Sequence, residues 1–139
     1  MEQRFENPKD EKLKKILKES KTIAVVGLSP DTSRPSYMVA NYLKRCGYKI
    51  IPVNPKYKEI LEEKSYPSLK DVPEKVDIVD IFRRSEDVLP IVEDAIKIKA
   101  KAIWMQEGIT NLDAAKKGKE NGILVVMDRC LYKEHRRLL

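Results

Sequence analysis

The sequence predicts a single α/β domain with a doubly wound parallel sheet of about five strands and helices on both faces. Three observations support this fold class. The chain has 139 residues, a length that suits one compact domain. Short apolar runs rich in β-branched residues alternate with segments of helical periodicity, as expected when crossover helices join parallel strands. The first of these runs also ends in a glycine shortly before a helix, an arrangement typical of ligand-binding turns.

The N-terminal segment predicts a short amphipathic helix that packs on the rest of the chain. Asn7 can cap this helix, and Pro8 suits its first position. The apolar residues at helical spacing are Leu13, Ile16 and Leu17. We therefore assign residues 1–20 to an N-terminal helix and residues 21–139 to the α/β domain.

Five apolar runs predict buried strands, and three segments between them predict helices. The strands are expected at residues 22–26, 49–53, 76–82, 102–105 and 124–127. The helices are expected at residues 35–45, 85–99 and 111–121. Residues 58–74 are expected to be mostly irregular, because the prolines of "YPSLKDVP" allow little more than a turn. The alternation of strands and helices predicts a Rossmann-like sheet, parallel and doubly wound.

Composition and charge exclude several classes of protein. The net charge of +6 favours anionic partners, but charges of both signs alternate along the chain, so a nucleic-acid interface is not expected. The basic segment "KEHRR" alone leaves nucleic-acid binding open as a weaker alternative. No apolar run approaches the roughly 20 residues of a membrane span, and the first residues lack the apolar core of a signal peptide. We expect a cytoplasmic protein without membrane contact, in which Cys46 and Cys130 are reduced.

The residues that follow the predicted strands form the candidate site, because ligands of open parallel sheets bind beyond the carboxyl ends of the strands. In strand order they are Gly27, Leu28, Ser29, Ser33, Arg34, Pro35 and Ser36; Asn54, Pro55 and Lys56; Phe82, Arg83 and Arg84; Gln106, Glu107 and Gly108; and Asp128, Arg129 and Cys130. Four of these five groups contain a cation. The crevice between them is therefore expected to attract an anionic ligand.

The end of the second predicted strand narrows the choice of ligand. A cofactor with a free ribose diol usually meets an Asp or Glu at this place, whereas this sequence has Lys56. Because a lysine attracts phosphate, we expect a phosphorylated ribose, as in coenzyme A or a 2′-phosphorylated nicotinamide cofactor. The nicotinamide cofactor is disfavoured, because Ser29 and Thr32 replace the second and third glycines of the usual dinucleotide-binding turn.

The loop before the helix at residues 35–45 can hold the diphosphate of such a ligand. Serine hydroxyls, backbone N–H groups near Pro35 and the guanidinium of Arg34 are all suitable donors. The loop taken alone also fits a simpler role, in which Ser33 caps the helix and Arg34 is solvated. Its expected convergence with "NPK" and "FRR" favours the ligand-binding role.

Four motifs in order resemble those of the small stand-alone CoA-binding proteins of bacteria and archaea. The motifs are "VVGLSPDTSRPSYMVANYLKRCGYKIIPVNP", "VDIVDIFRRSEDV", "AIWMQEGITN" and "GILVVMDRCLYKEHRRL". This family is related to the N-terminal domain of the succinyl-CoA synthetase alpha subunit, and the resemblance covers residues 21–139. It implies a Rossmann-like domain that binds coenzyme A or an acyl-CoA.

The resemblance also implies a role for each motif. "GLS" and "SRPS" would wrap the CoA diphosphate, and Lys56 of "NPK" would meet the 3′-phosphate on the adenosine side. Phe82 and Arg83, with Arg84 beside them, would flank the adenine and the pantetheine. The loop of residues 106–108 would lie nearer the pantetheine tail.

The C-terminal segment does not predict a catalytic or metal site. Cys130 and His135 are five residues apart, a spacing that places them on different helical faces. We therefore expect a buried cysteine and a surface histidine rather than a nucleophile and its base, or metal ligands with Asp128. Trp104 and Met105 lie in a predicted strand and are expected in the core.

No catalytic constellation is evident around the crevice. Outside the second helix and the C-terminal tail, Glu107 is the only carboxylate expected near it, and a lone acid provides no acid–base pair. We expect a binder of coenzyme A or acyl-CoA rather than an enzyme, with an NADP-type oxidoreductase as the alternative. A homodimer or a CoA-dependent partner protein stays open.

Overall fold

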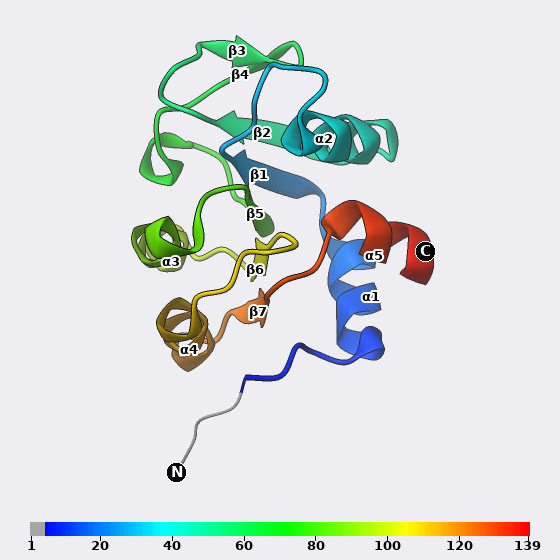
Figure 1. Cartoon of the computed structure of the whole chain (residues 1–139), viewed down its shortest axis with the longest axis vertical. Coiled ribbons are helices and arrows are strands. Elements are labelled where there is room, and N and C mark those ends of the chain that lie inside the picture. Colours follow the sequence, from blue (N-terminus) through cyan, green and yellow to red (C-terminus); the bar gives the residue numbers. More distant parts are fainter. Residues whose placement is uncertain (1–4) are drawn as a thin grey trace.

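The computed structural model describes residues 5–139, which form a parallel sheet between two layers of helices (Figure 1). The strands of this sheet are β1 (Thr22–Val26), β2 (Lys49–Val53), β5 (Ile78–Ile81), β6 (Ala102–Met105) and β7 (Leu124–Val126). The helices are α1 (Asp10–Glu19), α2 (Pro35–Arg45), α3 (Val88–Lys97), α4 (Leu112–Glu120) and α5 (Leu131–Leu138).

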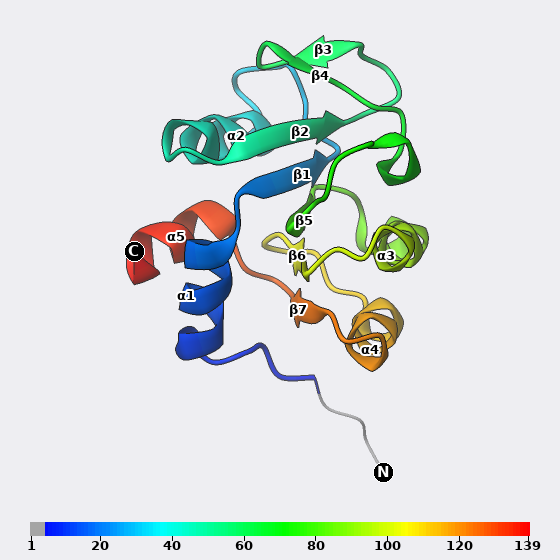
Figure 2. The ribbon, with the colours of Figure 1, turned by 180° about the vertical axis from the view of Figure 1, so that it is seen from behind.

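The strand order is β2-β1-β5-β6-β7, and all neighbouring pairs are parallel. Helices α1, α2 and α5 cover one face of the sheet, and α3 and α4 cover the other (Figures 1 and 2). The chain winds outward from β1 to β2 and then crosses to β5 on the other side of β1. The direction of winding therefore reverses between β1 and β5, where sheets of this kind hold their ligands. The predicted doubly wound α/β fold is confirmed.

Most predicted elements agree closely with the structure. Three strands and the helix at residues 35–45 have the expected bounds, and Asn111 caps α4 by accepting a hydrogen bond from the Ala114 amide at 3.0 Å. The third strand is shorter than residues 76–82. The helix expected at residues 85–99 begins as a 3₁₀ turn, η2 (Ser85–Asp87), and continues as α3.

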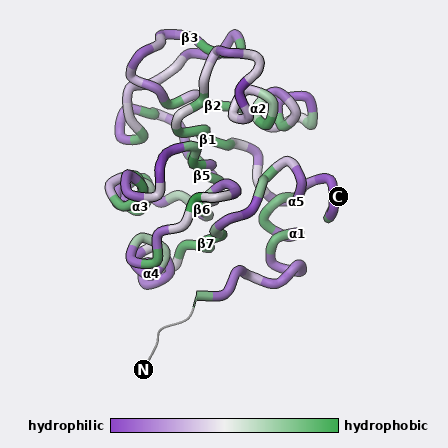
Figure 3. The backbone as a smooth tube through the Cα atoms, in the orientation of Figure 1, coloured by the Kyte–Doolittle hydropathy of each residue, from purple (hydrophilic) through white to green (hydrophobic). Residues whose placement is uncertain are grey.

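The core lies on both faces of the sheet, and the hydrophobic colouring of the strands is visible in Figure 3. Along β1, Ile23 and Val25 join the cluster beneath α1, α2 and α5, whereas Ala24 and Val26 join the cluster beneath α3. Strands buried on both faces need apolar residues at every position, which explains why the sequence predicts them well. Trp104 and Met105 are fully buried, as predicted.

The start of the N-terminal helix was predicted wrongly. The helix begins at Asp10 after Lys9, not at Pro8 after Asn7. Asn7 instead pairs with the backbone of Met127, just beyond β7, donating to its carbonyl at 2.8 Å and accepting from its amide at 2.7 Å. The Asn7 side chain thus occupies an edge of the sheet that would otherwise be open to another strand.

Residues 58–74, expected to be mostly irregular, contain a small hairpin of β3 (Glu59–Ile60) and β4 (Glu63–Lys64) and a 3₁₀ turn, η1 (Leu69–Asp71). The two residues of the hairpin turn, Leu61 and Glu62, have φ values of 55° and 62°. Such turns usually carry glycine or asparagine, so this sequence gave no hairpin signal.

The C-terminal segment forms helix α5, which is joined to α1 by an ion pair. The buried carboxylate of Glu134 accepts hydrogen bonds from Arg129 and Arg137, and its pKa is lowered, mainly by the hydrogen bond with Arg137. Arg137 also donates to both carboxylate oxygens of Asp10 on α1, at 2.7 and 2.8 Å. Arg137 therefore links the two terminal helices.

Candidate functional site

Gly27 brings the ends of three strands together. Its φ is +88°, and a Cβ atom at this position would lie 2.3 Å from the carbonyl oxygen of Phe82 at the end of β5. Its amide also donates to the carbonyl of Val53 at the end of β2, at 2.9 Å. Only glycine allows this close approach, so the end of β1 lies directly between the ends of its two neighbours.

The loop of residues 28–36 is held by hydrogen bonds of its own. The Ser29 amide donates to the hydroxyl of the buried Ser36 at 3.0 Å. The amide and hydroxyl of Ser33 both donate to Asp31, and these bonds lower the pKa of that carboxyl. Ser33 does not cap α2. The N-cap residue is Arg34, and its side chain makes no capping hydrogen bond. The Ser29 hydroxyl accepts from the Asp31 amide at 3.1 Å, so all three of the predicted ligand hydroxyls help to shape the loop.

Asn54 joins this loop to the end of β2. Its buried side chain donates to the Leu28 carbonyl and accepts from the Lys56 amide, both at 3.0 Å. Asn54 thus fixes the backbone on both sides of the site. The Lys56 side chain is exposed and forms no ion pair within residues 5–139.

The end of β5 contributes three side chains of different environment. Phe82 and Arg83 are half-buried, and Arg84 is exposed. Arg84 pairs with Glu86 at 3.1 Å and with Asp87 at 3.2 Å. Arg83 has no carboxylate partner in the described part of the chain, so its charge is available to a ligand.

These strand ends surround a cleft of about 690 Å³. The predicted residues that line it are Gly27, Ser29, Arg34, Pro35, Ser36, Asn54, Lys56, Phe82, Arg83 and Arg84. Tyr57, Asp87 and Ile109 also line the cleft and were not predicted. Glu107, the carboxylate expected near the crevice, does not line the cleft, whereas Asp87 does.

Of the loop after β6, Ile109 lines the cleft, but the predicted residues 106–108 do not. The buried Gln106 accepts a hydrogen bond from the first amide of α5, that of Leu131, at 3.1 Å. Glu107 pairs with Lys133 of α5 at 2.7 Å, and this contact raises the pKa of the lysine. The Gly108 amide donates to Asp128 at 2.6 Å. All three residues are engaged with the C-terminal segment.

Three other predicted residues also lie outside the lining of the cleft. Leu28 is fully buried, and Ser33 is exposed and bonded to Asp31. Pro55 lines a smaller hollow that adjoins the cleft at Arg83.

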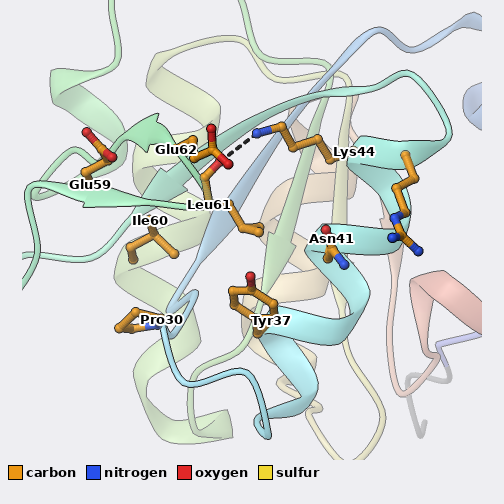
Figure 4. A pocket seen from close by; sticks show the side chains of 9 residues that line it. Pro30, Tyr37, Asn41, Lys44, Glu59, Ile60, Leu61 and Glu62 are labelled. Atoms are coloured by element: carbon orange, nitrogen blue, oxygen red, sulfur yellow. Dashed lines mark hydrogen bonds between the residues drawn. The ribbon is translucent and has the colours of Figure 1, made fainter.

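A separate hollow of about 540 Å³ lies between α2 and the β3–β4 hairpin (Figure 4). The Lys44 ammonium group donates to the Leu61 carbonyl at 2.6 Å and pairs with Glu63 at 3.1 Å, which anchors the hairpin to α2. Tyr37 and Asn41 of α2 face this space together with Pro30. This hollow shares no lining residue with the cleft.

The residues considered for catalysis lie apart from the cleft. Cys130 and His135 are both half-buried, so the expectation of a buried cysteine and a surface histidine was wrong. The Nδ1 atom of His135 lies 2.8 Å from the Tyr42 hydroxyl, and burial lowers the pKa of the imidazole. Within residues 5–139, no three His, Cys, Asp or Glu side chains are grouped to hold a metal ion.

One buried acid lies beneath the site. Asp80 on β5 is fully buried between Val25 and Trp104 of the adjacent strands. Its carboxyl oxygens have no hydrogen-bond partner among the described residues, and burial raises the pKa of the group well above its usual value.

Residues 21–136 match the family model described as CoA binding domain, and the chain belongs to this family. Uncharacterized protein YneT of Bacillus subtilis is 42% identical over 131 residues, which span 94% of this chain and 97% of that protein. The solved structure of a hypothetical protein from Pyrococcus horikoshii OT3 is also 42% identical, with a TM-score of 0.92 and 99% of both chains covered.

Two much larger proteins contain a similar segment. The ADP-forming acetate–CoA ligase II of Archaeoglobus fulgidus is 43% identical over 63 residues, which span 44% of this chain but 9% of that protein. The dinucleotide-forming acetyl-coenzyme A synthetase 1 of Ca. Korarchaeum cryptofilum is 30% identical with a TM-score of 0.68, covering 76% of this chain and 25% of that one. None of these four relatives is described as a nicotinamide-dependent enzyme. Among the described residues, no helix is long and apolar enough to cross a membrane.

Proposed function

We propose that the protein binds coenzyme A or an acyl-CoA in the cleft and does not turn it over. The observation that carries this proposal is the set of cations around the ends of β1, β2 and β5. Arg34, Lys56 and Arg83 all line the same cleft. A lysine stands where a carboxylate would meet an unphosphorylated ribose, which supports a ligand with a ribose phosphate.

The start of α2 suits the diphosphate. At the start of α2, Pro35 has no N–H, and the Tyr37 and Met38 amides donate to the Arg34 carbonyl, so the Ser36 amide is the donor left without a partner among the described residues. Arg34 lies close to this amide in the chain, and its contact with Asp31 is exposed and long, at 3.8 Å. A phosphate can compete with such a weak pair. Lys56, on the far side of Gly27, suits the 3′-phosphate.

The absence of catalysis is proposed from what the cleft offers. Acyl transfer needs a nucleophile, a matched base and donors aimed at an oxyanion. The carboxylate that lines the cleft, Asp87, pairs with Arg84. Glu107 pairs with Lys133, and His135 with Tyr42, both outside the cleft lining.

The ligand is tested by calorimetric titration of wild type, Lys56→Ala and Lys58→Ala with CoA and with 3′-dephospho-CoA. We expect Lys56→Ala to weaken CoA by about 1 to 3 kcal/mol, the scale of a charged hydrogen bond, and to leave dephospho-CoA nearly unchanged. Lys58 is exposed and does not line the cleft, so Lys58→Ala is the matched control. Equal losses for both ligands would show that Lys56 does not contact the 3′-phosphate.

Catalysis is tested by incubating the protein with acetyl-CoA or succinyl-CoA, with and without ATP and magnesium. We expect the thioester to persist at the background rate. Turnover that survives repurification and disappears in Cys130→Ala or Glu107→Ala would overturn the non-catalytic part of the proposal.

A further inference from the structure

A hollow of about 200 Å³ adjoins the cleft on the side of the sheet covered by α3. Arg83 lines both spaces, and Pro55 of the hollow lies between Asn54 and Lys56 of the cleft. The two spaces therefore meet at Arg83, beyond the ends of β1, β2 and β5. A ligand held in the cleft can extend past Arg83 into this hollow.

The walls of the hollow are mostly apolar. Pro55 and Pro67 contribute two rigid rings, and Leu69 and Ile91 contribute aliphatic side chains. Such walls suit a flat heterocycle and disfavour a diphosphate, which needs donors. Arg83 stands at the boundary, where a base and a charged sugar phosphate would meet.

Asp94 of α3 supplies a polar group at this apolar wall. It is half-buried, and its carboxylate has no ion pair or hydrogen bond within residues 5–139. Its neighbour Glu93 differs, since it pairs with Lys117 of α4 at 2.7 Å. An ionised carboxylate only accepts hydrogen bonds. Adenine presents an amino donor at position 6, whereas guanine and hypoxanthine present a carbonyl acceptor there.

We propose that this hollow holds the adenine of the ligand and that Asp94 selects adenine by accepting a hydrogen bond from its 6-amino group. The inference rests on the proposed function, because it takes the ligand to be a CoA bound with its phosphates in the cleft. Lys56 follows Pro55 directly, so a base in the hollow brings a ribose phosphate close to the lysine. Asp94 is thus a specificity-determining residue for the nucleotide end of the ligand.

The test compares adenosine 3′,5′-bisphosphate with inosine 3′,5′-bisphosphate by calorimetry, because these probes share every phosphate and differ in the base. We expect wild type to bind the adenosine compound at least about tenfold more tightly, as is usual for a hydrogen bond to a charged group. Asp94→Asn should reduce this preference to less than about threefold, because an amide can also donate to the hypoxanthine carbonyl. Glu93→Gln is the matched control and should keep the preference of wild type.

A parallel titration with CoA tests the proposed function separately from the selection of adenine by Asp94. If CoA binds but wild type does not discriminate between the bisphosphates, or if Asp94→Asn discriminates as well as wild type, this inference fails and the proposed function stands. If neither CoA nor the bisphosphates bind, the proposed function fails and the inference fails with it. Thermal unfolding of both variants verifies that they are folded, and Asp94→Ala replaces Asp94→Asn if the latter is not.

Discussion

Replacing Gly27 with alanine should damage both the fold and the site, because two separate costs act at this position. The φ of +88° is unfavourable for any L-residue, at about 1 to 2 kcal/mol. The new Cβ would also lie 2.3 Å from the Phe82 carbonyl oxygen and 3.2 Å from Nε of Arg83. Because the first of these neighbours is backbone, β1 and β5 must move apart, at a further cost of about 1 to 3 kcal/mol.

Gly47 provides a matched control for the conformational cost alone. Its φ is +102°, but a Cβ there would meet nothing within 4 Å. Gly47→Ala should therefore lower the free energy of unfolding by about 1 to 2 kcal/mol, and Gly27→Ala by about 2 to 5 kcal/mol. Urea unfolding followed by circular dichroism measures both values.

The same pair of variants tests the role of Gly27 in binding. Gly27→Ala displaces the Phe82 carbonyl and the Arg83 side chain, so calorimetry should show weaker binding of CoA. Gly47 lies at the far end of α2, so Gly47→Ala should leave the affinity unchanged. The reasoning is refuted if the two variants lose equal stability and bind CoA equally well.

Three further substitutions test the packing. Because the pKa of Asp80 is raised in the folded protein, this group makes the free energy of unfolding fall as the pH rises above about 4. In urea titrations, the stability of wild type relative to Asp80→Asn should therefore fall between pH 4 and pH 8. A difference that stays constant over this range contradicts the prediction. Glu134 has a lowered pKa, so its contribution to the free energy of unfolding is present above its unfolded pKa of about 4.5 and is lost at lower pH. Glu134→Gln should lower the free energy of unfolding by about 1 to 2 kcal/mol at pH 7 and by less at pH 4. An equal loss at both pH values argues against the ion pairs. Asn7→Ala removes both hydrogen bonds to Met127 and should lower the melting temperature, with a loss of about 1 to 3 kcal/mol; no loss would show that they add nothing to stability.

The sequence was most informative where one physical signal dominates. Strands buried on both faces require continuous apolar runs, and Asn111 follows the usual pattern of a helix cap. The hairpin was missed because Leu61 and Glu62 adopt a turn conformation that their side chains do not favour. Asn7 was misassigned because the same side chain can cap a helix or pair with a strand edge, and only the tertiary structure decides between them.

The candidate site was predicted well at the point where the winding of the sheet reverses and less well away from it. Gly27, Lys56 and Arg83 follow three adjacent strands, so the rule of strand ends brings them together. The same rule does not say that Gln106 turns toward the first amide of α5. Residues such as Asp94 lie on a helix rather than at a strand end, and no sequence motif identifies them.

The central claim is tested most directly by calorimetric titration of the purified protein with CoA and, under the same conditions, with NADP and NAD. The cations around the cleft and the lysine at the end of β2 predict that CoA binds with measurable affinity and that both nicotinamide cofactors bind at least about tenfold more weakly. Binding of NADP or NAD as tight as that of CoA, or no binding of CoA, would contradict the account.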